Sequence, residues 1–459
     1  MERDRYVDFL RAWAIVLVVL GHWVITGLVR QPDGAITAPE LLATVPWTQW
    51  LTLGFQIMPL FFFAGGCAAG GSWARARERG VTVAGWVGRR AVRLLLPTGV
   101  YSGLVLVAVA VCAALGVDPV TLALVGWALA MQFWFLPVYL LVSALTPALY
   151  ALHLRWGALA PAGTAGLALL VGVLDLAAGV PYVGALDYVL VWGVVYQLGF
   201  CLRDGLVGGG GSRRVAVAMT VGGWSAFAAL VGFGPFPVSL ILVTGQDPSN
   251  TNPPSAAMLA WAVGQVGACL LVAPVMRRLL VRERLWRAVR ATGAVSMTLY
   301  LWHMVPVLVI AAAFYLTGLA PQPAFGSAAW WGWRGPWLLV LGVVLVGVVR
   351  LLVPLERRLA SLELRPASLD RRPASPEAGG PRADAGFRQA WRLWAGLGLS
   401  VWALTYFAGH GFAYGGRFPV WGAAGLAVGT VLVLKAGGGV TGVRGRTAQG
   451  RAQGLEEAA

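Results

Sequence analysis

Long apolar runs recur along most of this 459-residue chain, and each is long enough to cross a membrane. A helix needs about 20 mostly apolar residues to span the hydrocarbon core of a bilayer. Charged residues make up 12% of the chain, whereas about 25% is usual in soluble domains. We therefore predict an all-α integral membrane protein, a polytopic helical bundle of about ten core transmembrane helices plus two appended C-terminal ones. The predicted spans are 7–29, 48–70, 91–114, 124–151, 157–179, 187–203, 214–234, 256–276, 293–318, 335–353, 391–410 and 418–435.

The basic residues test this set of spans, because cytoplasmic loops of membrane proteins carry an excess of Lys and Arg. With the N-terminus inside, only Arg30, Arg334 and Arg417 of the 35 Lys and Arg residues fall on the outer side. This distribution predicts a multi-pass protein of the plasma membrane, surrounded by lipid bilayer, with both termini cytoplasmic. A formal charge of +16 can also indicate nucleic-acid binding. Here the arginines stand in short clusters between apolar runs, so we predict no nucleic-acid partner.

Composition divides the chain after the tenth run. Residues 1–353 form the predicted ten-helix membrane domain, and 390–435 contain the two additional helices. Between them, 354–389 is charged and rich in Pro, Ala and Gly, which is typical of a flexible cytoplasmic linker. A short helical start at 354–364 is compatible with this composition. Residues 436–459 are similar and are predicted to form a disordered cytoplasmic tail.

The cysteines give no sign of a metal site. All four lie within apolar runs, and their spacing contains no CxxC pair. Such cysteines are usually small buried side chains rather than disulfides or metal ligands. We therefore predict no metal cofactor.

Three polar side chains interrupt the first apolar run, DFLRAWAIVLVVLGHW at residues 8–23. Eleven residues advance a helix by about 16 Å and three turns, so Arg11 and His22 share one face. Asp8 lies one turn before Arg11, close to the same face. Titratable groups are costly in hydrocarbon, so this face is expected to line a polar cavity. The alternative is that Arg11 snorkels to the interface and His22 only hydrogen-bonds across helices.

Two further stretches carry candidate functional groups. In GWVGRRAVRLLLP at 85–97, Arg90 and Arg93 lie one turn apart near the inner surface, where guanidinium groups suit phosphate ligands. An orientation signal alone also accounts for these arginines. In SMTLYLWHMVP at 296–306, His303 is either a catalytic group or a structural hydrogen-bonding side chain.

In this order, these stretches resemble the acyltransferase 3 family of integral membrane acyltransferases. The family's Arg-x10-His pattern matches at Arg11 and His22, and its Arg-x-x-Arg pattern matches at Arg90 and Arg93. Ala64 departs from the family, which often has serine there, so a hydroxyl is not expected to be essential. Three more stretches are similar to family segments: PLFFFAGG at 59–66, QFWFLPVYLL at 132–141 and LYLWHM at 299–304.

The resemblance covers residues 1 to about 353 and leaves the appended helices outside the usual ten. It implies transfer of an acyl group, usually acetyl, from cytoplasmic acyl-CoA to a hydroxyl at the outer face. The acceptor would be a carbohydrate, a cell-surface glycan or an exported small molecule. The expected donor is acetyl-CoA or another acyl-CoA, held by Arg90 and Arg93 with Arg11.

The resemblance also suggests roles for the buried polar groups. His22 would act as general base on the acceptor hydroxyl or carry the acyl group transiently. Asp8 would orient Arg11 through an ion pair. His303 would polarise the carbonyl or position the acceptor.

A multi-span transporter or flippase for an anionic or lipid-linked substrate is the competing class. Such proteins also combine many spans with buried polar groups. Transporters, however, tend to show repeats with broken helices at matching positions of two halves. The sequence shows no such pairing, and a layout of ten plus two argues against equal halves.

Overall fold

The computed structural model describes residues 4–207, 212–361 and 381–436. This part of the chain is helical apart from one small antiparallel hairpin, which confirms the all-α prediction. The hairpin pairs β1 (Val29–Arg30) with β2 (Ile36–Thr37) just beyond the first helix. The helices of the first half are α1 (Arg5–Ile25), α2 (Leu41–Thr44), η1 (Pro46–Trp50), α3 (Leu51–Phe55), α4 (Met58–Glu78), α5 (Val83–Ala114), α6 (Pro119–Ala128), η2 (Met131–Trp134), α7 (Phe135–Ala144), α8 (Thr146–Trp156), α9 (Leu159–Leu176), η3 (Val183–Leu186) and α10 (Asp187–Arg203).

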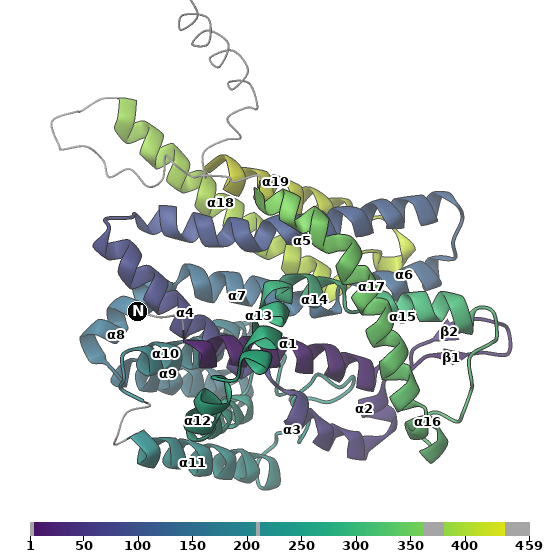
Figure 1. Cartoon of the computed structure of the whole chain (residues 1–459), viewed down its shortest axis with the longest axis horizontal. Helices are drawn as coiled ribbons and strands as arrows, with labels where there is room; N and C mark the ends of the chain where they lie inside the picture. The colour runs from purple at the N-terminus through teal and green to yellow at the C-terminus, as the bar shows by residue number, and fades with distance from the viewer. Residues whose placement is uncertain (1–3, 208–211, 362–380, 437–459) are drawn as a thin grey trace, which may run out of the picture.

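The described secondary structure of the second half is also helical. Its helices are α11 (Ser212–Gly232), α12 (Ala256–Leu279), α13 (Glu283–Ala294), α14 (Ser296–Trp302), α15 (Val305–Ile310), η4 (Ala311–Tyr315), α16 (Ala328–Gly332), α17 (Arg334–Ser361), α18 (Pro381–His410), η5 (Tyr414–Gly416) and α19 (Val420–Ala436). In Figure 1, α1 lies in the middle of the bundle, with α11 and α12 at one edge and α18 and α19 at the opposite edge. The helix α17 runs obliquely to α1 and contacts it.

The number of membrane-crossing segments agrees with the ten predicted core spans. Among the described residues, eight helical segments are long and apolar enough to cross a membrane, and two bent helix pairs raise this number to ten. The bent pairs are Pro119–Ala128 with Met131–Ala144, at 46°, and Ser296–Trp302 with Val305–Tyr315, at 41°. Each predicted core span overlaps one of these ten segments.

Local chemistry sets both ends of α1. At its start, the Asp4 carboxylate accepts a hydrogen bond from the Tyr6 amide at 2.9 Å, which caps a free helical N–H. At its end, Thr26 leaves the helical conformation, while its amide and its hydroxyl both donate to the carbonyl of His22. The helix therefore ends one turn after His22.

Glycines allow a close crossing of α4 with α10. A Cβ added at Gly66 would lie 1.9 Å from the carbonyl oxygen of Tyr196, and one at Gly199 would lie 2.2 Å from that of Phe63. Small residues let transmembrane backbones approach in this way and gain van der Waals contact. The PLFFFAGG stretch is therefore a packing element of α4.

The appended helices pack onto the ten-span domain. The helix α18 contacts η2 and α7, and α19 contacts α5. Their connecting turn reaches the end of α6, where the Phe412 amide donates to the carbonyl of Gly126 at 3.0 Å. The Phe412 ring is fully buried against Tyr101 and Phe133. The appended pair thus packs directly against the first bent pair.

The predicted linker is helical at both of its ends. The helix α17 continues to Ser361, and α18 begins at Pro381. Residues 362–380, and 437–459 of the predicted tail, lie outside the described part of the chain.

Candidate active site

Two of the predicted site residues, His22 and His303, meet in the structure. Nδ1 of His22 lies 2.7 Å from Nε2 of His303, although 281 residues separate them in the sequence. Their ring centroids are 4.9 Å apart and their planes differ by 13°, so nearly coplanar rings meet edge to edge in hydrogen-bonding geometry. His303 is fully buried, whereas His22 keeps part of its surface exposed. We refer to these two side chains as the histidine pair.

The surrounding hydrogen bonds assign the protons of the histidine pair. Nδ1 of His303 lies 2.9 Å from the carbonyl oxygen of Tyr300, which can only accept, so this nitrogen carries the proton. In a neutral His303 ring, Nε2 is then an acceptor, and Nδ1 of His22 donates to it. Nε2 of His22 is left with a free lone pair. That nitrogen is therefore able to take a proton from a substrate.

A break in the ninth span places His303 opposite His22. The helix α14 ends at Trp302 and α15 begins at Val305, with Pro306 in its first turn. Proline lacks the N–H that a continuous helix would require, which favours a new helix start at this position. The His303 carbonyl, released by the break, accepts from the Trp23 indole at 2.7 Å. Trp23 follows His22 on α1, so both residues face the break.

A second break, between α6 and η2, lies beside the first, and buried polar side chains satisfy the carbonyls around both. The Tyr101 hydroxyl donates to the Leu129 carbonyl at 2.7 Å, and the Tyr300 hydroxyl donates to the Gln132 carbonyl at 2.6 Å. The side-chain NH₂ group of Gln132 donates to the backbone carbonyls of Leu129 and Leu301. Because Leu129 lies at one break and Leu301 next to the other, these bonds join the two breaks. Irregular backbone at membrane depth is tolerated only where such partners or a cavity are present. These bonds hold the backbone next to His303.

The predicted charged residues lie away from the histidine pair. Arg11 is half-buried and lies about 16 Å before His22 along α1, and Asp8 lies one turn earlier still. On α5, Arg93 is exposed, and the guanidinium of half-buried Arg90 stacks over the Trp86 ring at 4.9 Å. The structure therefore brings the two histidines together and leaves the charged candidates toward the opposite ends of their helices.

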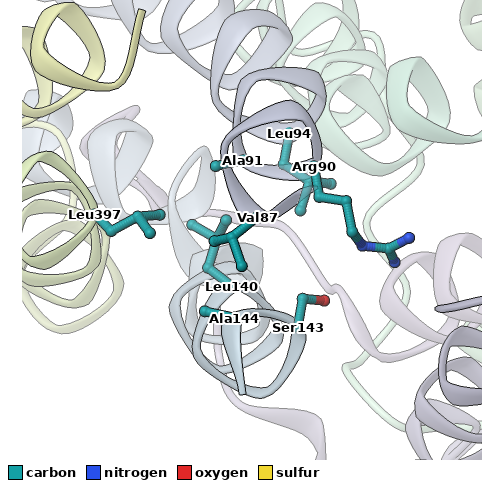
Figure 2. Close-up of a pocket in the computed structure, with 8 residues that line it drawn as sticks. All are labelled: Val87, Arg90, Ala91, Leu94, Leu140, Ser143, Ala144 and Leu397. Atoms are coloured by element: carbon teal, nitrogen blue, oxygen red, sulfur yellow. The ribbon is translucent and has the colours of Figure 1, made fainter. Parts of the chain in front are cut away.

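Arg90 also borders a small cavity between α5, α7 and α18. Its volume is about 10 Å³, which is room for about one water molecule. In Figure 2 the Arg90 guanidinium extends away from the apolar lining residues, toward the side on which the Ser143 hydroxyl lies. The Ser143 hydroxyl is buried without a hydrogen-bond partner among the described residues. A polar group can therefore be accommodated beside Arg90, although this cavity is too small for a whole acyl-CoA.

Sequence reasoning missed several residues that hold the histidine pair, among them Trp23, Gln132 and Tyr300. Their side chains bond backbone carbonyls of other helices, and helical periodicity carries no signal for such contacts. Pro306 was a usable signal for the break after His303. For a metal site, no group of three or more His, Cys, Asp or Glu side chains with suitable placement occurs in the described part of the chain.

Comparison with known proteins agrees with the resemblance. The sequence model of a family described as an acyltransferase domain matches residues 4–353, which is three quarters of the chain and all ten core spans. No curated protein and no solved structure matches the chain. The matched region contains both histidines, the Arg-x10-His pattern and the Arg-x-x-Arg pattern. The chain therefore belongs to the acyltransferase 3 family and is a membrane acyltransferase.

Proposed function

We propose that the protein is an O-acyltransferase of the plasma membrane with both termini in the cytoplasm. It moves an acyl group, in the first instance acetyl, from cytoplasmic acyl-CoA to a hydroxyl at the outer face. The acceptor is a carbohydrate, a cell-surface glycan or an exported small molecule. The observation that carries this proposal is the hydrogen-bonded histidine pair, because it leaves Nε2 of His22 free to act as a general base.

In the proposed reaction, Nε2 of His22 takes the proton of the acceptor hydroxyl while the hydroxyl oxygen attacks the thioester carbonyl carbon. The tetrahedral intermediate collapses with cleavage of the C–S bond, and the leaving thiolate recovers the proton from His22. The products are the acyl ester and free coenzyme A. His303 positions the base, because its Nε2 accepts from Nδ1 of His22 and stabilises the imidazolium that forms.

The donor would bind from the cytoplasmic side. Arg90 and Arg93 lie in the first turns of α5 and Arg11 lies in the second turn of α1. The proposed topology puts these helix ends in the cytoplasm, and guanidinium groups match phosphate geometry. Asp8, one turn before Arg11, would hold that arginine in place. The acyl thioester would then extend along the α1 face toward His22, about 16 Å away.

The first experiment compares acetyl-CoA binding and slow thioester hydrolysis in nanodiscs for wild type, His22→Ala and an Arg90→Ala/Arg93→Ala double variant. We expect His22→Ala to bind acetyl-CoA normally and to lose turnover by about 10²–10⁴-fold, since this is what a general base contributes. The double arginine variant should lose binding. Matched controls are His410→Ala, an exposed histidine at the end of α18, and Arg213→Ala/Arg214→Ala, an exposed pair on α11.

Two results would contradict the proposal. If the wild-type protein does not bind acetyl-CoA, the proposed donor is wrong, and the transporter or flippase alternative should be tested next. Equal turnover in His22→Ala and His410→Ala would show that the histidine pair has no part in the chemistry.

A further inference from the structure

A second cavity lies beyond the C-terminal end of α1, which the proposed topology places at the outer face. It has a volume of about 220 Å³ and lies between the end of α15, the segment after it and the first turns of α17. Leu28, which follows α1, is part of its wall. Its aromatic lining includes Trp330, Trp333 and Trp337. We refer to this cavity as the outer pocket.

Arg334 supplies the charge of the outer pocket, and it is one of the three basic residues that the sequence places outside. The residue is only 9% exposed. Nη1 donates to the carbonyl of Thr26 at 2.8 Å and to that of Trp23 at 3.5 Å. The guanidinium carbon lies 3.5 Å from the centre of the Trp330 ring.

The hydrogen-bonding capacity of Arg334 is not used up by these contacts. Its Nε is buried and has no hydrogen-bond partner among the described residues. Its contacts in that part of the chain are carbonyl oxygens and tryptophan faces, and none is a carboxylate. A buried guanidinium with a free donor and unbalanced charge favours an anionic ligand, because an oxyanion would supply both missing interactions.

The rest of the outer pocket suits a single sugar ring. Trp333 is 50% exposed and presents a flat apolar surface to the pocket. Gln322 also lines the pocket; its side-chain oxygen accepts from the Arg30 amide, which leaves its NH₂ group available for a hydroxyl. Drug-sized ligands usually need pockets of about 300–1,000 Å³, so a volume below that range favours a ligand of about one ring.

Trp23 connects the outer pocket to the histidine pair. Its carbonyl accepts from Arg334 and, at 3.0 Å, from the Trp337 indole. Its own indole donates to the His303 carbonyl. Because Trp23 directly follows His22, these hydrogen bonds link Arg334 to the residue next to the proposed base and to the backbone of its partner His303.

We infer that the outer pocket is the acceptor subsite and that it takes a monosaccharide unit carrying an oxyanion, either a carboxylate or a phosphate. Arg334 binds the anionic group, and the tryptophans stack against the ring. The assignment of this ligand as acceptor rests on the acyl-transfer function proposed above. Binding of the ligand does not depend on that function.

The test measures binding by isothermal titration calorimetry to the full chain in nanodiscs of neutral phosphatidylcholine. The probes are methyl glucuronide, glucose 1-phosphate and the uncharged methyl glucoside. The variants are Arg334→Gln, Arg334→Lys and Trp333→Leu. Arg417→Gln is the matched control, since Arg417 is an exposed outer arginine that does not line the pocket.

We expect wild type to bind at least one of the two anionic sugars about tenfold or more tightly than the glucoside, as a charge-assisted hydrogen bond predicts. Arg334→Gln should abolish this preference, whereas Arg334→Lys and Arg417→Gln should keep it. Trp333→Leu should weaken the binding of every sugar that the wild type binds. Because Trp333 is half-exposed, this variant provides a test even if Arg334→Gln does not fold.

The inference is overturned if wild type shows no preference for an anion, or if the preference survives in Arg334→Gln. It is also overturned if phosphatidylglycerol in the disc displaces the sugar in an Arg334-dependent way, because the pocket would then be a lipid headgroup site. Acetyl-CoA hydrolysis, measured in the same discs, separates the two proposals. Hydrolysis without sugar binding removes only the pocket assignment, and sugar binding without hydrolysis removes only the acyl-transfer function.

Discussion

At the scale of single residues, the proton on His22 is positioned by a chain of three groups. The Tyr300 carbonyl fixes the tautomer of His303, and His303 in turn accepts from Nδ1 of His22. The lone pair on Nε2 of His22 is thus a consequence of a backbone carbonyl next to a helix break. A polar substitution that preserves the acceptor should therefore be tolerated better than an apolar one.

This leads to a prediction for His303. In His303→Gln, the side-chain oxygen can take the place of Nε2 and accept from His22, whereas His303→Leu leaves that donor without a partner. We expect His303→Leu to lower kcat by about 10²-fold or more, which is within the range of general-base effects. His303→Gln should retain a larger fraction of the wild-type kcat than His303→Leu does. Acyl transfer rates at saturating acetyl-CoA measure the difference. Equal losses in both variants would show that His303 does not act by accepting this hydrogen bond.

At the scale of helices, hydropathy alone located all ten core spans, because length and apolar content are local properties of the sequence. The bends inside two of them were not predicted. Each break is stabilised by side chains from elsewhere, such as Tyr101 bonding Leu129 and Tyr300 bonding Gln132. Likewise, the sequence indicated His22 and His303 separately, but their contact depends on how α1 packs against the ninth span. Arg334 could have been singled out from the sequence, because it is one of only three basic residues that the predicted topology places outside.

The crossing of α4 and α10 gives a prediction at this scale. In Gly199→Ala the new methyl group would overlap the Phe63 carbonyl, so the backbones must separate, at a cost of about 1–3 kcal/mol. Gly193→Ala, on the same helix, has nothing within 4 Å of the new Cβ and should be neutral. Thermal unfolding of both variants in one detergent gives the comparison. A matching loss in Gly193→Ala would mean that the effect comes from the helix itself and not from the crossing.

At the scale of the whole molecule, the appended helices are joined to the domain that carries the site. Phe412 fills a space beside Tyr101 and Phe133, next to the break between α6 and η2. We predict that Phe412→Ala lowers the free energy of unfolding by about 3–5 kcal/mol, as expected for removal of a buried aromatic ring. Acyl transfer should fall as well, because the break between α6 and η2 loses its support.

The control for Phe412 is Trp421→Ala on α19, since Trp421 is 75% exposed and should contribute little to packing within the chain. Thermal unfolding and acyl transfer are measured together on both variants. Full activity in Phe412→Ala, despite lower stability, would show that the appended pair stabilises the bundle without influencing the site.

The last prediction concerns the orientation of the bundle in the membrane, which determines which residues are accessible from outside the cell. In a variant without the four native cysteines, Arg417→Cys between α18 and α19 should react with a membrane-impermeant maleimide on intact cells. Arg278→Cys, at the opposite end of the arrangement inferred from the arginines, should react only after permeabilisation. Labelling of Arg278→Cys in intact cells would reverse the inferred topology.

The separation of 281 residues between the two histidines also bears on biosynthesis. A ribosome adds about 5–20 residues per second, so His22 enters the membrane well before the helix that carries its partner. Phe412, whose ring packs next to the break between α6 and η2, is synthesised later still. Under the proposed mechanism a nascent chain therefore holds an unassembled base, and acyl-CoA is protected from premature hydrolysis until the bundle is almost complete.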